Sequence, residues 1–347
     1  MKAGRLSFGI AGCGSAGRGH IGKLLQIPEV WIKAICEPNR EQARSARSII
    51  TADTGQQVQQ YAHFKEMLSQ CDVDAIGIFT PHHLHAEQVT EALEKGCHVI
   101  VEKPLCITAE EARAILALAR RKERLVACCH NMRMIATAMR ARKIIREGGI
   151  GEVRHVSSLF SQQWVREAQA SRRSWRFEPS ISGGGHLLDS GSHVLDIVLW
   201  CLGLSPVSAF ARADESRIGV DVNCSAVIRL EDGVSWTLDV LGECPHEFIV
   251  RFYGSKAVLR LEPSVLRRFP VTEDRVKIEE VTVEPGGTDP MTNFARALLG
   301  DEKPLCDAES CVDTVRLTQA LYESMATGKA IDLKPFELEA ESEESEE

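Results

Sequence analysis

A glycine-rich segment near the N-terminus has the residues and spacing that bind the pyrophosphate of a dinucleotide. Gly12, Gly14 and Gly17 form a G-x-G-x-x-G motif that encloses Ser15 and Ala16. In this motif the first glycine permits a tight turn, the second lets a pyrophosphate approach the backbone, and the third lets the helix pack on the preceding strand. The pyrophosphate then lies at the positive N-terminus of that helix. We predict that these five residues bind a dinucleotide.

A carboxylate follows this motif at the distance that ribose binding requires. Glu37 lies 20 residues after Gly17, at the end of the apolar segment 31–36. An acidic residue there accepts hydrogen bonds from the ribose hydroxyls of NAD and repels the 2′-phosphate of NADP. The sequence therefore favours NAD. Arg40, three residues further on, offers a phosphate partner and leaves NADP as the alternative.

A lysine follows another apolar segment. Glu102-Lys103-Pro104 comes directly after residues 98–101, and ligands of open α/β sheets bind beyond the carboxyl ends of the strands. The ammonium of Lys103 would hydrogen-bond a substrate hydroxyl and ease the loss of its proton. A lysine that merely pairs with a neighbouring glutamate is the competing interpretation, and position alone does not separate the two.

A second group of chemical residues follows a run of three glycines at 183–185. Asp189 and His193 are four residues apart, so on a helix they would share one face. Asp189 would orient the imidazole, and His193 would take the hydroxyl proton as hydride leaves the carbon. Asp196 and His186 compete for these roles. A capping aspartate with a core histidine is the alternative without chemistry.

Together these motifs resemble the Gfo/Idh/MocA oxidoreductase family, which includes glucose–fructose oxidoreductase and inositol dehydrogenases. The resemblance covers about residues 6–333. It rests on the glycine motif, Thr80-Pro81 with His85, Glu102-Lys103-Pro104, Asn131 with Arg133, Asp189 with His193, and the segment 320–328. It implies that Lys103 polarises the hydroxyl or relays its proton, that His193 is the general acid and base, and that Asp189 is its orienting partner.

The resemblance also implies further contacts with cofactor and substrate. Thr80, Pro81, His82 and His85 would lie along the nicotinamide side, although His82 stands where asparagine is usual. The remaining expected cofactor contacts are Glu102, Asn131, Trp175 and Arg176. We expect the substrate to contact Lys103, Arg133, Trp164, Asp189 and His193. We predict no metal site, because no cysteine or carboxylate near His82, His83 and His85 completes a tetrahedral set.

The elements that position these residues change in character along the chain. Up to residue 130, apolar segments at 6–11, 31–36, 75–79, 98–101 and 125–129 alternate with helical segments from about 16 and at 40–50, 83–95 and 109–122. Such alternation predicts an α/β Rossmann domain with a doubly wound parallel sheet. Beyond 150, hairpins at 222–240 and 248–261 and helices at 186–202, 290–300 and 308–326 predict an α+β domain with an open, mainly antiparallel sheet. The predicted divisions are 1–130, 131–334 and an acidic, disordered tail at 335–347.

Composition excludes several classes of function. The net charge of −8 comes largely from seven glutamates after residue 336, so no basic surface indicates nucleic-acid binding. No apolar run is long enough to span a membrane, and the N-terminus has no signal-peptide pattern. The 12 cysteines include no C-x-x-C, which predicts reduced thiols in a cytoplasmic protein. The family resemblance implies a homodimer or homotetramer formed through the second sheet.

These features predict hydride transfer between NAD and a secondary alcohol of a sugar, a sugar derivative or a cyclitol. Two alternatives stay open. One is an NAD-dependent enzyme that cleaves glycosides by transient oxidation and elimination. The other is a catalytically silent dinucleotide sensor, against which the joint presence of Lys103, Asp189 and His193 argues.

Overall fold

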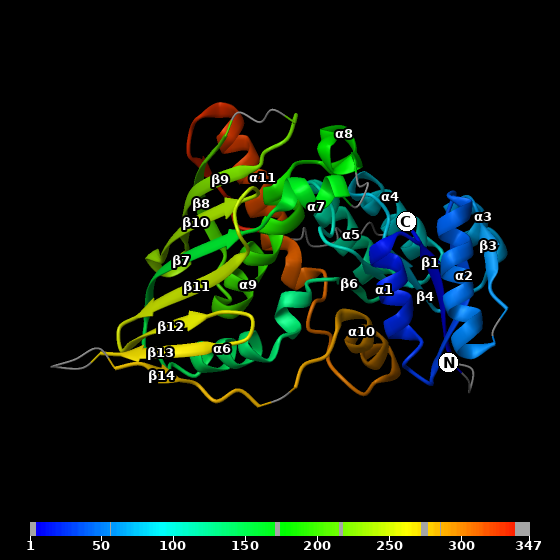
Figure 1. Ribbon diagram of the computed structural model, residues 1–347, viewed down its shortest axis with the longest axis horizontal. Coiled ribbons are helices and arrows are strands. Elements are labelled where there is room, and N and C mark those ends of the chain that lie inside the picture. Colours follow the sequence, from blue (N-terminus) through cyan, green and yellow to red (C-terminus); the bar gives the residue numbers. More distant parts are fainter. Residues whose placement is uncertain are drawn as a thin grey trace, which may run out of the picture.

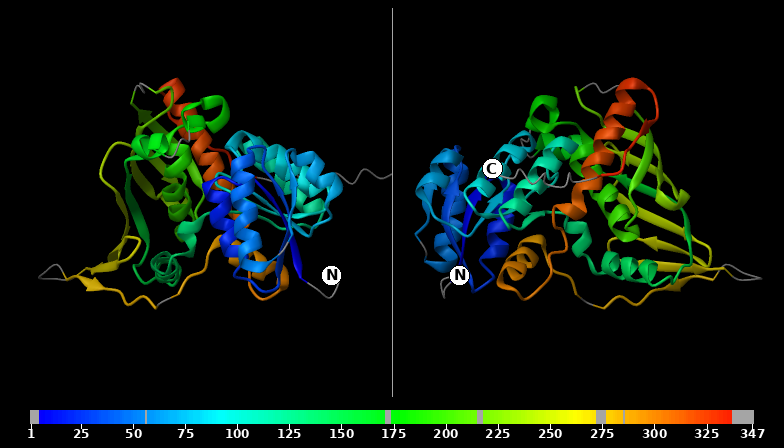
Figure 2. Two further views of the ribbon diagram at one scale, coloured as in Figure 1. Left: turned by 45° about the vertical axis from the view of Figure 1, so that its right-hand side comes forward. Right: turned by 180° about the vertical axis from the view of Figure 1, so that it is seen from behind.

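Two β-sheets organise the chain in the computed structural model, which describes residues 5–55, 57–170, 174–214, 218–271, 277–284 and 286–336. The first 130 residues build one sheet with its helices, and the second sheet forms the opposite side of the molecule (Figure 1). Helices α9 and α11 lie between the two parts in all views (Figure 2). From residue 337 onward, the predicted acidic tail lies outside the described residues.

The first sheet has six parallel strands in the order β3-β2-β1-β4-β5-β6. They are β1 (Leu6–Ala11), β2 (Val30–Cys36), β3 (Gln59–Tyr61), β4 (Ala75–Ile78), β5 (His98–Val101) and β6 (Val126–Cys128). This order confirms the predicted Rossmann domain. The strand order reverses between β1 and β4, so the loops after these two strands meet where such sheets bind their ligands.

Among the described residues this domain has five helices, two of which begin at side-chain caps. The helices are α1 (Ser15–Leu24), α2 (Arg40–Thr54), α3 (Phe64–Gln70), α4 (His85–Glu94) and α5 (Ala109–Arg121). The Asn39 side chain caps α2, and Thr108 forms a reciprocal capping box with Glu111 at the start of α5, which satisfies amides that have no partner within the helix. The predicted helix at 83–95 divides into a 3-10 turn, η1 (His82–Leu84), and α4. No helix among the described residues is both long and apolar enough to cross a membrane.

The second sheet has nine strands in the order β14-β13-β12-β11-β7-β10-β9-β8-β15. The strands are β7 (Val153–Ser161), β8 (Pro206–Ala213), β9 (Asn223–Leu230), β10 (Ser235–Leu241), β11 (Glu247–Gly254), β12 (Ala257–Leu261), β13 (Leu266–Pro270), β14 (Glu279–Glu280) and β15 (Ile331–Asp332). Among the described strands of this second sheet, only the β7–β10 pair is parallel. The mainly antiparallel sheet and both predicted hairpins, β9–β10 and β11–β12, are therefore confirmed.

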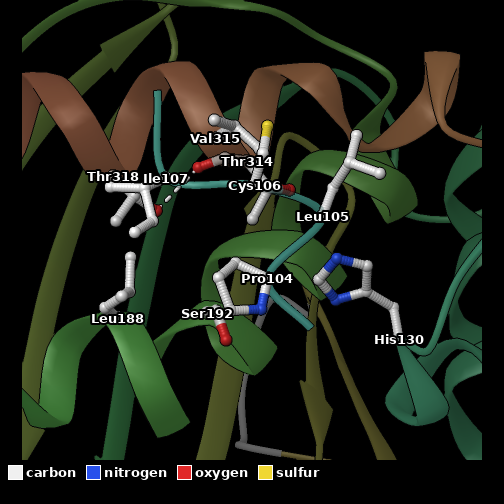
Figure 3. Close-up of a pocket in the computed structure, with 10 residues that line it drawn as sticks. All are labelled: Pro104, Leu105, Cys106, Ile107, His130, Leu188, Ser192, Thr314, Val315 and Thr318. Carbon is white, nitrogen blue, oxygen red and sulfur yellow. Dashed lines mark hydrogen bonds between the residues drawn. The ribbon is translucent and has the colours of Figure 1, made fainter. Parts of the chain in front are cut away.

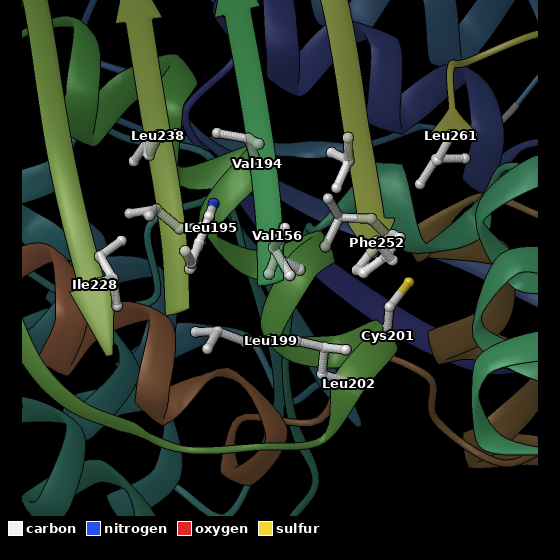
Figure 4. Packing of buried hydrophobic residues seen from close by; sticks show 14 of the residues in the cluster. Val156, Val194, Leu195, Leu199, Cys201, Leu202, Ile228, Leu238, Phe252 and Leu261 are labelled. Atoms are coloured by element: carbon white, nitrogen blue, oxygen red, sulfur yellow. The ribbon is translucent and has the colours of Figure 1, made fainter. Parts of the chain in front are cut away.

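A large hydrophobic core joins this sheet to helices α6 (Ala136–Arg146), α9 (Ser192–Leu202) and α11 (Val312–Thr327). Apolar side chains of α9, including Val194, Leu195 and Leu199, face the strands (Figure 4). Trp236 is completely buried and donates its indole N–H to Ser158 Oγ at 2.7 Å. This core fixes α9, the helix that begins directly before His193.

The C-terminal part of the chain returns to the Rossmann domain. Helix α10 (Pro290–Leu299) contributes Met291, Phe294 and Ala295 to the core around β1, where the rings of Phe8 and Phe294 lie 6.1 Å apart. The start of α11 packs into the core on the other side of that sheet. The N-terminal core therefore draws on more than the first 130 residues, and the division at residue 130 stays a prediction.

Candidate active site

A crevice of about 650 Å³ opens where the first sheet reverses its strand order. Loops after β1, β2, β4 and β5 form one wall, and residues from the second domain complete it. Twelve of the predicted site residues line it: Gly12, Gly14, Ser15, Ala16, Glu37, Thr80, Pro81, His82, Glu102, Lys103, Trp175 and Arg176. The fold therefore gathers these residues from five separate stretches of sequence into one cavity of the size that binds a cofactor.

The glycine turn is packed too closely for side chains. Gly12 has φ +85°, and a Cβ there would lie 2.5 Å from the carbonyl oxygen of Phe79. A Cβ on Gly17 would lie 2.0 Å from the oxygen of Gly12. Gly14 precedes α1 without a side-chain cap. The start of the helix thus faces the crevice with bare backbone, as anion binding requires.

Glu37 is held rigidly beside this turn. Its Oε2 accepts a hydrogen bond from Cys13 N at 2.8 Å, and its Oε1 accepts one from Asn39 N at 2.9 Å. Each carboxylate oxygen keeps a further lone pair for a hydroxyl of a ligand. Arg40, the first residue of α2, is exposed and is not among the residues that line the crevice.

Lys103 forms an ion pair with Asp189 across the two domains. Its Nζ donates to Asp189 Oδ1 at 2.7 Å and to the Asp189 backbone oxygen at 2.5 Å. The carboxylate also accepts from Trp164 Nε1 at 2.7 Å and from Arg176 Nε at 2.7 Å. Burial raises the pKa of Asp189, but the charges of Lys103 and Arg176 outweigh burial and hold the pKa well below its usual range. The side chain of Lys103 thus pairs with Asp189, and its contact with the adjacent Glu102 is made by the Lys103 backbone N–H.

The predicted hydrogen bond between Asp189 and His193 is not among those of the described residues, because the Asp189 carboxylate has other partners. The expected helix at 186–202 starts with a π-helical turn, η4 (Leu187–Gly191), before α9. This wider turn changes which residues share a face, and the Asp189 carboxylate is occupied by other donors. His193 Nδ1 is buried without a hydrogen-bond partner among the described residues. Burial and the nearby charge of Lys103 lower the pKa of His193 to about 3, so its imidazole is neutral at pH 7.

The prediction that Arg133 contacts substrate is wrong. Its side chain is completely buried. Nε and Nη2 donate to Asp196 at 2.8 and 2.5 Å, and Nη1 donates to the oxygen of Leu305 at 3.0 Å. Asp196, a competitor for the role of Asp189, is thereby an interior partner of Arg133. His186, the competitor of His193, is likewise fully buried, with Nδ1 3.2 Å from the oxygen of Val222.

Three further predicted contacts, His85, Trp164 and Asn131, are not among the residues that line the crevice. His85 is completely buried, and its ring nitrogens lie 2.7 and 2.9 Å from the backbone oxygens of Pro104 and Thr80. It therefore braces the loops of the crevice and has no nitrogen left for a cofactor. Trp164 is buried and donates its indole N–H to Asp189, so it supports that carboxylate. Asn131 is exposed in the 3-10 turn η2 (Asn131–Met134) and is not among the lining residues.

His82 lines the crevice, and Ser182 and Trp175 of the second domain contact its ring. Its Nδ1 lies 2.7 Å from the oxygen of Ser182, and its ring packs edge-on against Trp175 at 4.9 Å. Burial, together with the neighbouring His85, lowers the pKa of His82 to about 3. The ring is therefore neutral and positions Trp175 at the mouth of the crevice.

Sequence reasoning missed His20. This residue on α1 stacks on Phe79 with ring centroids 4.5 Å apart, and its Nε2 lies 2.7 Å from Glu102 Oε1. Burial raises the pKa of Glu102, but the contact with His20 and the charge of Lys103 lower it to about 2. No spacing rule would reveal this pair, because 82 positions separate its members.

A tyrosine–aspartate pair that the sequence did not reveal holds the glycine run before η4. Asp221 accepts from Gly185 N, from Leu187 N and from the Tyr322 hydroxyl, at 2.8, 2.8 and 2.7 Å. The Tyr322 oxygen in turn accepts from Gly185 N at 3.0 Å. These bonds fix the turn that carries Asp189. Tyr322 lies within the segment 320–328 that supported the family resemblance.

Comparison with family models agrees with this two-part organisation. Residues 6–130 match the model described as an oxidoreductase family with an NAD-binding Rossmann fold. Residues 138–260 match the model of the GFO/IDH/MocA C-terminal domain. The two matches cover the part that carries the crevice and most of the second sheet.

Individual relatives act on sugars according to their names. The 3-reductase for dTDP-3,4-didehydro-2,6-dideoxy-alpha-D-glucose from Streptomyces antibioticus is 31% identical over 270 residues, which are 76% of this chain and 77% of that protein. D-xylose 1-dehydrogenase (NADP(+)) 2 from Haloferax volcanii is 26% identical over 94% of this chain and 100% of that protein.

Levoglucosan dehydrogenase is similar in both sequence and structure. The protein from Pseudarthrobacter phenanthrenivorans is 30% identical over 201 residues, which are 57% of this chain and about half (51%) of that protein. A solved structure of levoglucosan dehydrogenase with NADH and levoglucosan has a TM-score of 0.82 and 23% identity, and the match covers 94% of this chain and 99% of that one. At this identity the structural likeness concerns the fold.

Proposed function

Because the chain belongs to the Gfo/Idh/MocA family of NAD(P)-dependent oxidoreductases, we propose that it transfers hydride between NAD and a secondary alcohol of a sugar, a sugar derivative or a cyclitol. One observation carries this proposal. Lys103, which is paired with the buried Asp189, lines the same crevice as the glycine turn. A polarising cation is thereby placed beside a dinucleotide site, which is the arrangement that alcohol oxidation needs.

The crevice fits a dinucleotide and favours NAD. The bare backbone at Gly12 and Gly14 would hold the pyrophosphate, and Glu37 would accept hydrogen bonds from the ribose hydroxyls. The bound nicotinamide supplies the hydride acceptor or donor. A 2′-phosphate would meet the carboxylate of Glu37, so NAD is preferred. The relative named as an NADP(+) enzyme is the reason to measure both cofactors.

Lys103 is the group that polarises the hydroxyl. Only 13% of its side chain is exposed, so little water screens its charge. In such surroundings an ammonium stabilises a developing alkoxide more strongly than it would in water. Asp189 holds the ammonium in place, and Arg176 and Trp164 hold Asp189. In this proposal Asp189 positions Lys103, and it does not position His193.

His193 is the proton acceptor. Its ring is neutral because its pKa is lowered to about 3, and Nδ1 is without a partner among the described residues. A neutral imidazole can take the hydroxyl proton as the C–H bond breaks. Because the unpartnered Nδ1 is buried, we assign this role to Nε2.

Assembly and location remain proposals as well. We propose a homodimer or homotetramer through the open face of the nine-stranded sheet, where Val207 and Val227 are exposed. Sedimentation equilibrium of the full chain tests this assembly, and a monomer at micromolar concentration would contradict it. A cytoplasmic location is consistent with the free thiols of all 12 cysteines.

A dehydrogenase screen tests the proposed reaction. The full chain is incubated with inositols, sugars, glycosides and nucleotide sugars, with NAD and NADP in parallel, and NAD(P)H absorbance is followed. Lys103→Ala should abolish the activity found, and Lys33→Ala, outside the crevice, should preserve it. Full activity of Lys103→Ala would refute the assignment. Cleavage of a glycoside without free NADH would favour the elimination enzyme, and NAD binding without any turnover would favour the sensor.

A further inference from the structure

A histidine with no role in the proposed chemistry contacts the loop that carries Lys103. His20 lies on α1, the helix that follows the glycine turn. Its Nε2 lies 2.7 Å from Oε1 of Glu102, and its ring stacks on Phe79 with an angle of 24° between the two planes. The side chains of His20 and Glu102 are only 17% and 20% exposed, so water screens their contact little. Two separate contacts therefore fix this imidazole.

The charge of Glu102 decides which of the two groups donates. Burial raises the pKa of Glu102, but the contact with His20 and the charge of Lys103 lower it to about 2. The carboxyl group is therefore ionised at neutral pH, and an ionised carboxylate only accepts hydrogen bonds. Nε2 of His20 must carry the proton and donate it. Hydrogen bonds to an ionised acceptor are stronger than neutral ones, so His20 holds this oxygen of Glu102 firmly.

The other oxygen of Glu102 holds the backbone of Lys103. Oε2 accepts a hydrogen bond from Lys103 N at 3.0 Å. At its far end the Lys103 side chain donates to Asp189 Oδ1 at 2.7 Å. A lysine side chain is a flexible four-carbon stem, so the place of its ammonium depends on where its backbone is held. Glu102 fixes that backbone, and His20 fixes Glu102.

The residues that follow Lys103 are held by packing. Leu105 and Cys106 are buried. Figure 3 shows the segment from Pro104 to Ile107 between α9, which carries Ser192, and α11, which carries Val315. On the other side, strand β5 ends at Val101. Glu102 and Lys103 are thus a two-residue connection between two fixed segments, and their side-chain partners His20 and Asp189 hold it.

We propose that His20 is a positioning residue for the reaction, because by holding Glu102 it sets the position from which Lys103 polarises the substrate hydroxyl. This inference rests on the proposed hydride transfer. His20 is not among the residues that line the crevice, so it acts through Glu102. It also lies on the helix whose N-terminus would bind the pyrophosphate. One side chain thereby connects the cofactor helix with the loop of the polarising lysine.

Two substitutions of His20 separate its hydrogen bond from its ring. His20→Phe keeps a ring against Phe79 and removes the donor, whereas His20→Gln keeps an N–H donor. On a substrate found by screening, His20→Phe should lower kcat by about 10-fold to 100-fold, because a small displacement of a reacting group is this costly. KM should stay near that of the wild type, since the ammonium acts mainly on the alkoxide that develops in the transition state.

The matched variant and a distant one are the controls. His20→Gln should recover most of the lost kcat, and His246→Phe, at an exposed position, should equal the wild type. Full activity of His20→Phe would overturn the proposal. An equal loss in His20→Phe and His20→Gln would also overturn it, because the ring and not the hydrogen bond would then matter.

The pH profile gives a readout that a purely structural role would not change. Without the donor of His20, the pKa of Glu102 should rise from about 2, so its protonation begins at a higher pH. The acid limb of kcat/KM in His20→Phe should therefore lie at higher pH than in the wild type or in His20→Gln. Coinciding acid limbs would contradict the proposal. The titratable groups close to Glu102 are His20 of α1, His85 of α4, the adjacent Lys103, Cys129 after β6 and His193 of α9.

Chemical labelling tests the position of Lys103 without any substrate. The full chain is treated with acetic anhydride, and acetylation of Lys103 is followed by mass spectrometry against the exposed Lys33 as internal reference. Lys103 is 13% exposed and paired, so it should react slowly in the wild type and several-fold faster in His20→Phe. If His20→Phe fails to fold, Glu102→Gln replaces it, because loss of the charge weakens both hydrogen bonds.

The two measurements distinguish failure of this inference from failure of the proposed function. Equal acetylation of Lys103 in the wild type and in the variant would overturn the role of His20, whether or not a substrate is found. Faster acetylation in the variant, together with a wild type that turns over no alcohol, would support the positioning of Lys103 and contradict the proposed hydride transfer.

Discussion

Asp189 and Asp196 lie seven residues apart and have similar hydrogen-bond partners, but they lie in different surroundings and have different roles. Each accepts hydrogen bonds from an arginine, and each has a pKa below its usual range because neighbouring cations outweigh burial. Asp189 also holds Lys103, and both Lys103 and Arg176 line the crevice. Asp196 and Arg133 are completely buried. Access to the crevice, and not the kind of residue, separates the two.

The comparison also shows how the second domain divides its tasks. The π-helical turn presents Asp189 to the Rossmann domain, and the first turn of α9 directs Asp196 into the interior. His193 lies between them in sequence, and its Nδ1 is unpartnered among the described residues. One short segment thus supplies the proposed chemistry at its start and an interior ion pair at its end.

The largest expected effect comes from His193, the residue between the two carboxylates. Loss of a general base typically lowers a rate by about 10²–10⁴-fold, so we expect a reduction of this order in kcat for His193→Ala. NAD affinity, measured by calorimetry, should stay near that of the wild type. His246→Ala, at an exposed position, is the control. A loss of NAD affinity with unchanged kcat would show that His193 belongs to the cofactor site.

The next largest effect distinguishes the two arginines. Arg133→Met leaves Asp196 charged and buried, and breaking such a pair costs about 3–5 kcal/mol. Arg176→Met should cost less stability, because Asp189 keeps Lys103 and Trp164, and should mainly lower kcat/KM. Urea unfolding of both variants gives the free energies, and the substrate found by screening gives the rates. If both variants lost the same free energy of unfolding, Asp189 and Asp196 would not differ in how strongly they depend on their arginines.

The features that the sequence predicted correctly depend on residues that lie close together in the chain. The glycine turn, the alternation of strands and helices, and the hairpins β9–β10 and β11–β12 all follow from local spacing. Strand β7 was missed although it is central in its sheet, because its sequence VRHVSSLFS mixes serine, histidine and arginine with few apolar residues. Its burial depends on the strands on either side.

Partner choice could not be predicted, because it depends on how distant elements pack. Lys103 and Asp189 are 86 positions apart, and Arg133 and Asp196 are 63 apart. Four-residue spacing suggested that Asp189 would serve His193, but a π-helical turn changed the geometry. Arg133 was assigned to substrate because nothing in the sequence shows that its guanidinium is enclosed.

A smaller effect concerns the pH dependence of stability on the active-site side. The folded pKa of His193 is lowered from 6.5 to about 3, so the unfolded chain binds its proton first. Stability from the neutral ring is present above about pH 6.5 and is lost as the pH falls toward 3. In His193→Gln, the decline of the midpoint of thermal unfolding between pH 6.5 and 4 should be shallower. The exposed control His246→Gln should follow the wild type, and identical slopes in all three would contradict the shift.

The smallest expected effect compares two hydrogen-bonding side chains, one that holds the turn before Asp189 and one that contacts Asp196. Tyr322→Phe removes a hydroxyl that donates a hydrogen bond to Asp221 and accepts one from Gly185 N. These two hydrogen bonds hold the turn before Asp189. Thr314→Val removes a weaker 3.3 Å hydrogen bond to Asp196. Thr314→Val should cost about 1 kcal/mol in urea unfolding, the usual contribution of one hydrogen bond, and Tyr322→Phe about 2 kcal/mol, because it removes these two. Only Tyr322→Phe should also lower kcat/KM several-fold, because misplacing a reacting group slows the reaction steeply. If Thr314→Val slowed the reaction as much, the interior ion pair would position the active site as directly as the π-helical turn does.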